Sequence, residues 1–135
     1  MKQNETDLSI LLKNINPILN SGDYVICTTP DFRVVNIGEI VMMFRENEGF
    51  TIILKKELAD TLGLSYSFTA AWITLVVNSS LLAIGFTSAF AKALTENGIS
   101  CNVVAAFYHD HIFVAKKDTT KAMKVLKNLS YNSNL

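Results

Sequence analysis

The stretch from Trp72 to Val114, WITLVVNSSLLAIGFTSAFAKALTENGISCNVVAAFYHDHIFV, decides the fold expected for this chain. It begins within an apolar run, residues 69–77, whose poor alternation predicts a central strand covered on both faces. A helix is expected over residues 80–97, because an apolar stripe recurs there at helical spacing in Leu82, Phe86, Ala89, Phe90, Ala93 and Leu94. Ser79 or Ser80 is predicted to cap its start and Gly98 its end. Residues 100–108 and 111–114 then predict a hairpin that turns at His109 and Asp110.

The segments on either side supply further elements of the same kind. Before the stretch, the sequence predicts a helix over residues 8–15 capped by Thr6 or Asp7, and a strand over residues 24–29. A hairpin is expected from residues 40–45 and 50–54, followed by a helix from Lys55 that Gly63 ends. After the stretch, Asp118 opens a last helix, whose buried side is expected at Ala122, Val125, Leu126 and Leu129. Residues 130–135 are expected to fray.

A weak internal repeat relates the two halves. In each half a hairpin leads into two lysines, an acid and a helix, at Lys55-Lys56-Glu57 and at Lys116-Lys117-Asp118. The acid needs no functional explanation, because a carboxylate is favourable in the first turn of a helix. The repeat predicts an α+β protein of two fused ferredoxin-like (βαββαβ) units, with antiparallel sheets and helices on one face. The first unit, residues 1–65, is abbreviated because residues 31–38 are too short and irregular for a helix; the second spans residues 66–130, and residues 131–135 form a tail.

Composition and charge limit the classes of function. The chain has 135 residues, of which 50% are hydrophobic and 18% charged, and its formal net charge is zero. Nucleic acid and acidic membranes are therefore not expected as partners. Between residues 61 and 115 only Lys92, Glu96 and Asp110 are charged, so this region needs burial or a partner. The lysines at 116, 117, 121, 124 and 127 are interpreted as the solvated face of a helix, with lipid or nucleic-acid contact as the alternative.

Neither a disulfide nor a targeting segment is predicted. The two cysteines, Cys27 and Cys101, lie far apart in strand-like runs and outside any CxxC motif. The N-terminal residues lack the pattern of a signal peptide, and no apolar run reaches the roughly 20 residues of a membrane span. We expect a soluble, cytoplasmic protein.

The sequence resembles a known family. Gly98-Ile99-Ser100-Cys101-Asn102-Val103-Val104, combined with Tyr108-His109-Asp110-His111-Ile112-Phe113-Val114, is similar to the C-terminal unit of small bacterial proteins made of tandem ACT-like domains, and the likeness extends in outline to nearly the whole chain. The resemblance implies a regulatory module that binds an amino acid and acts on a target enzyme, whose identity the sequence does not show. One feature departs from the family pattern: ACT domains commonly carry Asp or Asn with Gly about three residues later, whereas here Asn78 is followed by Ser79, Ser80 and Leu81, and glycine arrives only at Gly85.

The first functional hypothesis places an amino acid at the start of the helix over residues 80–97. The unpaired N–H groups of a helix N-terminus suit a carboxylate. The residues expected to line this site are Asn78, Ser79, Ser80, Leu81, Gly85 and Asn102. Asn102 would offer its amide oxygen to the ammonium group, since the fold predicts no acid nearby. Each residue also has a structural explanation: the serines as caps, Gly85 in helix packing and Asn102 in a backbone hydrogen bond.

The second hypothesis is an assembly module without a ligand. Apolar side chains stand on both faces of one strand, at Trp72, Ile73, Leu75, Val76 and Val77, and two small helices would leave part of this area exposed. Pairing of two chains would cover it, so a homodimer is expected. The two hypotheses are compatible.

Metal binding and catalysis are weaker alternatives. His109 and His111 could share a zinc ion as residues i and i+2 of a strand, but two ligands fall short of the usual set, and solvent-facing histidines at a turn are the simpler interpretation. No cofactor is expected. The chain has no hydrolase elbow, phosphate loop or zinc-protease motif, and Cys101 lies too far along its strand from His109 for a nucleophile and base, so no enzyme is predicted.

Overall fold

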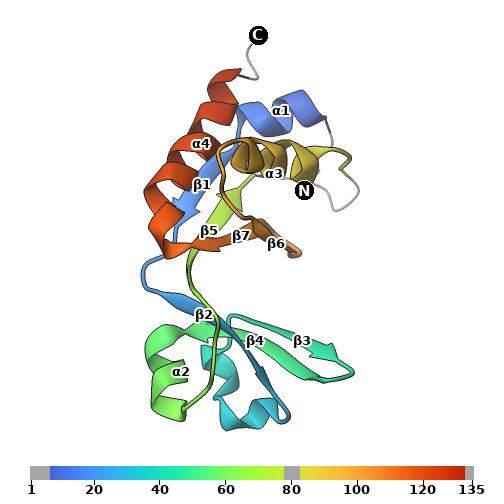
Figure 1. The fold of residues 1–135 in the computed structure, drawn as a ribbon. Helices are drawn as coiled ribbons and strands as arrows, with labels where there is room; N and C mark the ends of the chain where they lie inside the picture. Colours follow the sequence, from blue (N-terminus) through green and yellow to red (C-terminus); the bar gives the residue numbers. More distant parts are fainter. Residues whose placement is uncertain (1–6, 78–82, 133–135) are drawn as a thin grey trace. The chain divides into compact units, whose positions relative to one another are not determined.

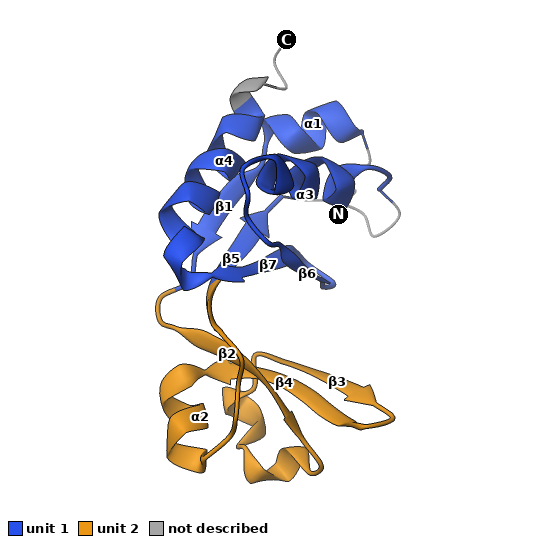
Figure 2. Ribbon diagram, viewed as in Figure 1, with its two compact units in different colours: residues 1–20, 72–135 blue, residues 21–71 orange. Residues whose placement is uncertain are grey.

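The chain divides into two units that do not follow chain order. A computed structural model describes residues 7–77 and 83–132 (Figure 1). Unit 1 consists of Met1–Asn20 and Trp72–Leu135, and unit 2 of Ser21–Ala71 (Figure 2). The sequence placed the division after residue 65, with the N-terminal residues in the first unit. In the structure Met1–Asn20 belongs to the same unit as the C-terminal part, because a strand at residues 16–19 pairs with residues 73–76.

Unit 2 is a ferredoxin-like sheet with one helix. Its strands are β2 (Tyr24–Thr29), β3 (Met42–Glu46), β4 (Gly49–Lys55) and the start of β5 (Thr69–Val76), in the order β3-β4-β2-β5, and each neighbouring pair is antiparallel. Helix α2 (Lys56–Leu62) follows β4. Two 3-10 turns, η1 (Phe32–Val34) and η2 (Ile37–Glu39), stand between β2 and β3, where a complete unit has its first helix. The expectation of an abbreviated first unit is confirmed.

Unit 1 is a complete unit whose last strand comes from the N-terminal segment. It contains α1 (Leu8–Lys13), β1 (Asn16–Leu19), the rest of β5, α3 (Phe86–Glu96), β6 (Asn102–Ala105), β7 (Asp110–Ala115), the turn η3 (Lys116–Asp118) and α4 (Thr119–Asn132). Its sheet runs β1-β5-β7-β6. Counted from β5, this is the order 4-1-3-2 of a ferredoxin-like sandwich, with β1 as strand four.

Strand β5 belongs to both units. Its first residues pair with β2, at Tyr24 with Ala70, and its later residues pair with β1, from Leu19 with Ile73 to Asn16 with Val76. Ala70, Ile73 and Leu75 are fully buried, and Ala71 and Thr74 are nearly so. The prediction of a central strand is confirmed, and this role explains why the run lacks polar alternation.

Local chemistry fixes several helix ends as predicted. The Asp7 carboxylate accepts hydrogen bonds from the N–H groups of Ser9 and Ile10 and so caps α1. Gly63 ends α2 in the left-handed conformation, with φ +70°. Helix α4 starts one residue after Asp118 and continues through residues 130–132, so the expected fraying from residue 130 is wrong there; residues 133–135 lie outside the described part.

The start of α3 differs from the prediction. The helix begins at Phe86 instead of residue 80, and its N-cap is Gly85, not a serine. Gly85 has φ +88°, a left-handed conformation in which a helix cannot continue toward the N-terminus. A Cβ atom at this position would lie 3.3 Å from Cδ2 of Leu8. The backbone therefore favours glycine at this position, and any larger residue would also crowd Leu8 of α1.

The hairpin of unit 1 also turns earlier than expected. Strand β6 ends at Ala105, and the N–H of Ala106 donates to the carbonyl of His109 at 3.0 Å. Asp110 pairs with Ala105 and is the first residue of β7 instead of part of the turn. Within residues 7–77 and 83–132, no helix is both long and apolar enough to cross a membrane.

Candidate functional site

Most of the residues predicted to bind a ligand cannot be placed. Asn78, Ser79, Ser80 and Leu81 lie outside the described residues. The fifth, Gly85, stands at the start of α3 as its N-cap.

Asn102 stands apart from Gly85. It lies at the first position of β6, paired with Phe113, and its Nδ2 donates to the Phe113 carbonyl at 3.2 Å. Because α3 leads into β6, the start of β6 lies at the opposite end of the unit from the start of α3. The structure does not bring Gly85 and Asn102 together, and the backbone hydrogen bond is the observed role of the Asn102 side chain.

The N-terminus of α3 has the features of an anion site. Among the residues that the structure describes, no side chain caps it, and the carbonyl of Gly85 accepts the N–H of Ala89 at 2.9 Å. The N–H groups of the first helical turn point out of the helix without an intrahelical acceptor. Phe86 and Phe90 are buried with their rings in an edge-to-face contact, 5.2 Å between centroids, and they anchor this turn. The two buried rings thus fix the position of the helix N-terminus, which is the positive end of the helix dipole.

A buried acid lies at the same end of unit 1. The side chain of Trp72 stacks on Phe113, and Oγ1 of Thr74 lies 3.0 Å from Nδ1 of His111, so β5 and β7 run in opposite directions. One residue before His111, Asp110 therefore stands beside the end of β5, from which the chain leads to α3. The turn between β6 and β7 and the start of α3 lie on the same side of unit 1 (Figure 1).

The face on which Asp110 lies follows from strand alternation. His111 and Phe113 share the face of Trp72, so Asp110 lies on the opposite face with Ile112 and Val114, which are fully buried. Helix α4 packs against β1 and β7, and α3 packs against α4. Asp110 is only 8% exposed, and burial raises the pKa of its carboxyl group while the charge of His109 lowers it. Asp110 is thus a buried acid at this end of unit 1, which the sequence-based expectation did not include.

A polar network occupies the other face of this sheet. The indole Nε1–H of Trp72 donates to Nδ1 of His111 at 2.9 Å, and Nδ2 of Asn20 donates to Oγ1 of Thr74 at 2.9 Å. Because an indole is only a donor, Nδ1 carries the lone pair and the neutral imidazole has its proton on Nε2. Burial lowers the pKa of His111, and the nearby His109 lowers it further. His111 is therefore a structural residue, and the expectation that it faces solvent is wrong.

The alternatives of metal binding and catalysis gain no support from this geometry. The rings of His109 and His111 are 6.4 Å apart, and Nδ1 of His111 is engaged by Trp72. Among the residues that the structure describes, no three His, Cys, Asp or Glu side chains form a group that could hold a metal ion. Burial raises the pKa of Cys101 to about 11, so its thiol is a poor nucleophile at neutral pH.

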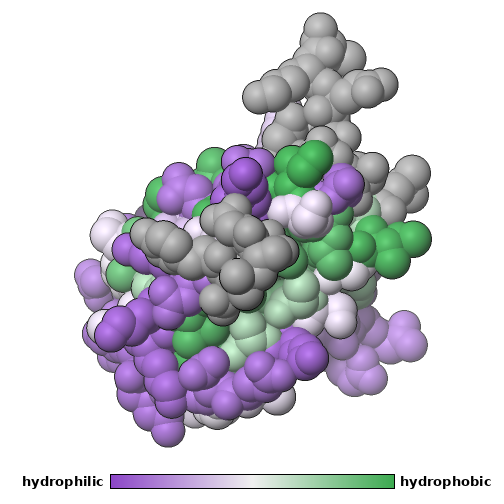
Figure 3. All heavy atoms as spheres, turned by 90° about the horizontal axis from the view of Figure 1, so that it is seen from above, coloured by the Kyte–Doolittle hydropathy of each residue, from purple (hydrophilic) through white to green (hydrophobic). Residues whose placement is uncertain are grey.

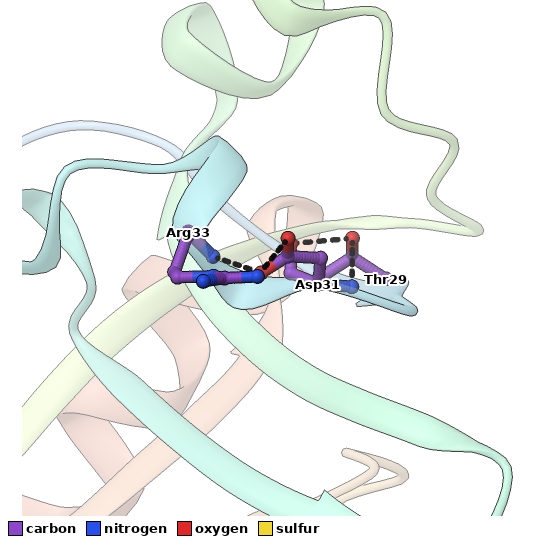
Figure 4. A network of polar contacts seen from close by, with 3 residues as sticks. All are labelled: Thr29, Asp31 and Arg33. Atoms are coloured by element: carbon purple, nitrogen blue, oxygen red, sulfur yellow. Dashed lines mark hydrogen bonds and ion pairs between the residues drawn. The ribbon is translucent and has the colours of Figure 1, made fainter.

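At the corresponding position of unit 2, the acid is paired with a neighbouring arginine on the surface. After β2, the Asp31 carboxylate accepts hydrogen bonds from the backbone N–H, Nε and Nη2 of Arg33, and Oγ1 of Thr29 donates to the Asp31 carbonyl (Figure 4). The Arg33 guanidinium lowers the pKa of Asp31. Since a 3-10 turn replaces the helix here and the carboxylate is already paired, unit 1 holds the better candidate site.

Comparison with known domains defines the class of protein. Two family models, both described as ACT domain, match residues 3–71 and 67–128. The chain therefore belongs to the ACT-domain family and carries two ACT domains in tandem, as the resemblance implied.

Solved structures extend this result. A crystal structure of a protein of unknown function from Vibrio cholerae, described as a possible transport protein, is 41% identical, with a TM-score of 0.80 over 91% of this chain and 95% of that chain. The ligand-free regulatory subunit of aspartate kinase from Thermus thermophilus is 10% identical, with a TM-score of 0.62 over 84% of this chain and 95% of that chain. The second likeness shows the fold alone. None of the curated proteins compared with the chain matches it.

Proposed function

We propose that this protein is a regulatory module that binds an amino acid at the start of α3 and has no catalytic role. The observation that carries the proposal is the N-terminus of α3, which no described side chain caps, at the same end of unit 1 as a buried acid, in a chain made of two ACT domains. The helix dipole and outward N–H groups suit a carboxylate, and an acid suits an ammonium group. An amino acid carries both groups.

The likeness to aspartate kinase regulatory subunits supports the regulatory part of this proposal. Those proteins share the fold of this chain. A ligand regulates such a module only if it binds one conformation more tightly than another. We infer that the amino acid acts in this way on a target enzyme.

A second candidate function is assembly of two copies of the chain. Ile84 is 87% exposed, and Phe107 and Tyr108 are each 76% exposed, with their rings 5.0 Å apart. Hydrophobic patches also interrupt hydrophilic ones on the face drawn in Figure 3. Large apolar side chains that reach the surface together are typical of contact sites. Light scattering would support a dimer by a mass twice that of the chain, and a monomer at micromolar concentration would exclude assembly as the function.

The binding proposal is tested by thermal unfolding of the purified protein with each common amino acid at millimolar concentration. A ligand at a hundred times its dissociation constant stabilises the folded state by about 2.7 kcal/mol, which raises the unfolding temperature by several degrees. We expect one amino acid, or a few related ones, to produce this shift. If no amino acid moves the midpoint, the proposed function is wrong.

A further inference from the structure

We propose that His111 is an acid-sensitive switch in unit 1: its protonation releases the Trp72 side chain and loosens the point from which both connections to unit 2 leave. The proposal concerns protons and holds whether or not the protein binds an amino acid. It starts from the polar network on the sheet face that bears Trp72, Thr74 and His111, and from the place of Asn20 in the chain.

The two connections between the units leave unit 1 at neighbouring residues. The first follows Asn20, and the second precedes Trp72. The carbonyl of Trp72 accepts a hydrogen bond from the backbone N–H of Asn20 at 2.9 Å and another from Asn20 Nδ2 at 3.2 Å. Toward unit 2, the pairing of β5 resumes only at Tyr24 with Ala70. Asn20 and Trp72 therefore tie the two connections to each other where they leave unit 1.

A single ring nitrogen of His111 contacts this tie through two side chains. Nδ1 accepts the indole Nε1–H of Trp72 at 2.9 Å and lies 3.0 Å from Oγ1 of Thr74. Oγ1 of Thr74 in turn accepts a hydrogen bond from Nδ2 of Asn20 at 2.9 Å. The indole also packs on the imidazole, with ring centroids 5.7 Å apart, and stacks on Phe113. The position of the indole therefore depends on the state of Nδ1.

Protonation of His111 acts differently on the two partners of Nδ1. It places a hydrogen on this nitrogen, which can then donate but no longer accept a hydrogen bond. The Thr74 hydroxyl can accept from it, because a hydroxyl group both donates and accepts. The Trp72 indole can only donate, so two donors would face each other across 2.9 Å. Protonation therefore displaces the indole and leaves Thr74 a partner.

The charged groups around His111 come from its own strand. His109 lies on the same face, with its ring 6.4 Å from the ring of His111, and Asp110 lies on the opposite face. The neighbouring strands β5 and β6 place uncharged side chains against His111: Trp72, Thr74 and Val104. Of the described groups, His109 is thus the charged one that faces His111.

These surroundings set the pH range in which the switch acts. Burial lowers the pKa of His111, and His109 lowers it further, so the ring is neutral at neutral pH and protonates below the ordinary pKa of about 6.5. An arrangement in which the indole has left and the ring is solvated binds the proton more tightly. Acid therefore shifts the population toward that arrangement.

The fluorescence of Trp72 tests the first half of the proposal, because it is the only tryptophan of the chain. A protonated imidazole quenches an indole beside it, so we expect the emission of wild type to change with a midpoint below about pH 6.5. His111→Asn should abolish the change, since Oδ1 of asparagine can replace Nδ1 as an acceptor and does not titrate. His109→Asn is the matched control: the change should remain, with a higher midpoint, because the charge of His109 no longer opposes protonation.

Amide hydrogen exchange of the full chain tests the second half. The protection of the Asn20 amide in wild type, corrected for the intrinsic pH dependence of exchange, should fall about fivefold or more between about pH 7.5 and about pH 5, as loss of one buried hydrogen bond predicts. The amides of β4 in unit 2 should keep their protection. In His111→Asn the protection of Asn20 should stay constant as well.

Four results would overturn the proposal. The first is an equal fluorescence change in wild type and His111→Asn, or no change in wild type. The second is a fluorescence change with constant protection at Asn20, and the third is an equal loss of protection at Asn20 and in β4, which indicates general acid unfolding. The fourth needs no variant: the ring protons of His111, followed by NMR in wild type, titrate with a midpoint different from that of the fluorescence.

Discussion

Replacement of Gly85 by alanine should destabilise unit 1 through two separable effects. The first is backbone strain, because the φ of +88° suits glycine and costs an L-residue about 1–2 kcal/mol. Alanine also restricts the unfolded chain, which offsets about 0.4–1 kcal/mol of that cost. The second effect is steric, because the new Cβ would lie 3.3 Å from Cδ2 of Leu8, which must move by a few tenths of an ångström. The net loss should be about 1 kcal/mol.

Gly98→Ala separates these effects. Gly98 has a similar φ of +73°, but nothing lies within 4 Å of the position of its Cβ. It should therefore show only the backbone strain, and Gly85→Ala should be the more destabilising of the two. In a Leu8→Ala background the extra cost of Gly85→Ala should disappear, as a double-mutant cycle would show.

Urea unfolding gives the free energies of unfolding directly for wild type, the three single variants (Gly85→Ala, Gly98→Ala and Leu8→Ala) and the double variant. Thermal unfolding should show that Gly85→Ala lowers the unfolding temperature by about 3–5 °C. A Gly85→Ala protein as stable as wild type would refute the assigned backbone conformation. An equal cost for Gly85→Ala with and without Leu8 would refute the contact between α1 and the start of α3.

Three further predictions concern the core, the histidine network and the buried thiol. Phe90→Ala, at a fully buried position, should cost about 3–5 kcal/mol in urea unfolding, whereas Phe107→Ala, at a 76% exposed position, should cost less than about 0.5 kcal/mol; similar losses would contradict the packing. Burial and His109 lower the pKa of His111 in the folded state, so folding favours its neutral form. The stability that this neutral form contributes is present above the ordinary pKa of about 6.5 and is lost as the pH falls through the lowered pKa. Wild type should therefore lose stability relative to His111→Asn on acidification, and parallel pH profiles would contradict this. With its pKa raised to about 11, Cys101 should be alkylated far more slowly than glutathione at pH 8, with about one thiol in a thousand ionised; equal rates would contradict its burial.

The elements that local chemistry determines could be predicted from the sequence. Asp7 caps α1 because its carboxylate reaches the N–H groups of the next residues, and Gly63 ends α2 because glycine adopts a positive φ without strain. The hairpin of β3 and β4 follows from a turn between apolar runs. In each case the residues that decide the structure are neighbours along the chain.

The elements that distant pairing determines could not be predicted. Strand β1 is only four residues long, Asn16–Leu19, and contains Pro17. Nothing in the pattern of these residues indicates that they pair with residues 73–76 and complete a sheet. The start of α3 was also missed, because the apolar stripe includes Leu82 and the preceding serines are good caps, whereas Gly85 sets the start through its conformation and its contact with Leu8.

The sequence places the candidate site at the start of the same helix as the proposed function does, and this placement stays a prediction. The sequence placed Asp110 in a turn, where a carboxylate is solvated, and named Asn102 as the ammonium partner. In the structure the turn ends one residue earlier, so Asp110 enters β7, and strand alternation then puts it on the covered face, opposite to His111. A shift of one residue thus changed a surface acid into a buried one.

The central claim is that an amino acid binds unit 1 at the start of α3, and backbone amide NMR during a titration tests it most directly. With the amino acid that stabilises the protein, the largest chemical-shift changes should fall on the amides of Phe86, Thr87 and Asp110, and those of Asp31 and Arg33 in unit 2 should change little. Changes concentrated at Asp31 and Arg33, with the start of α3 unaffected, would contradict the account.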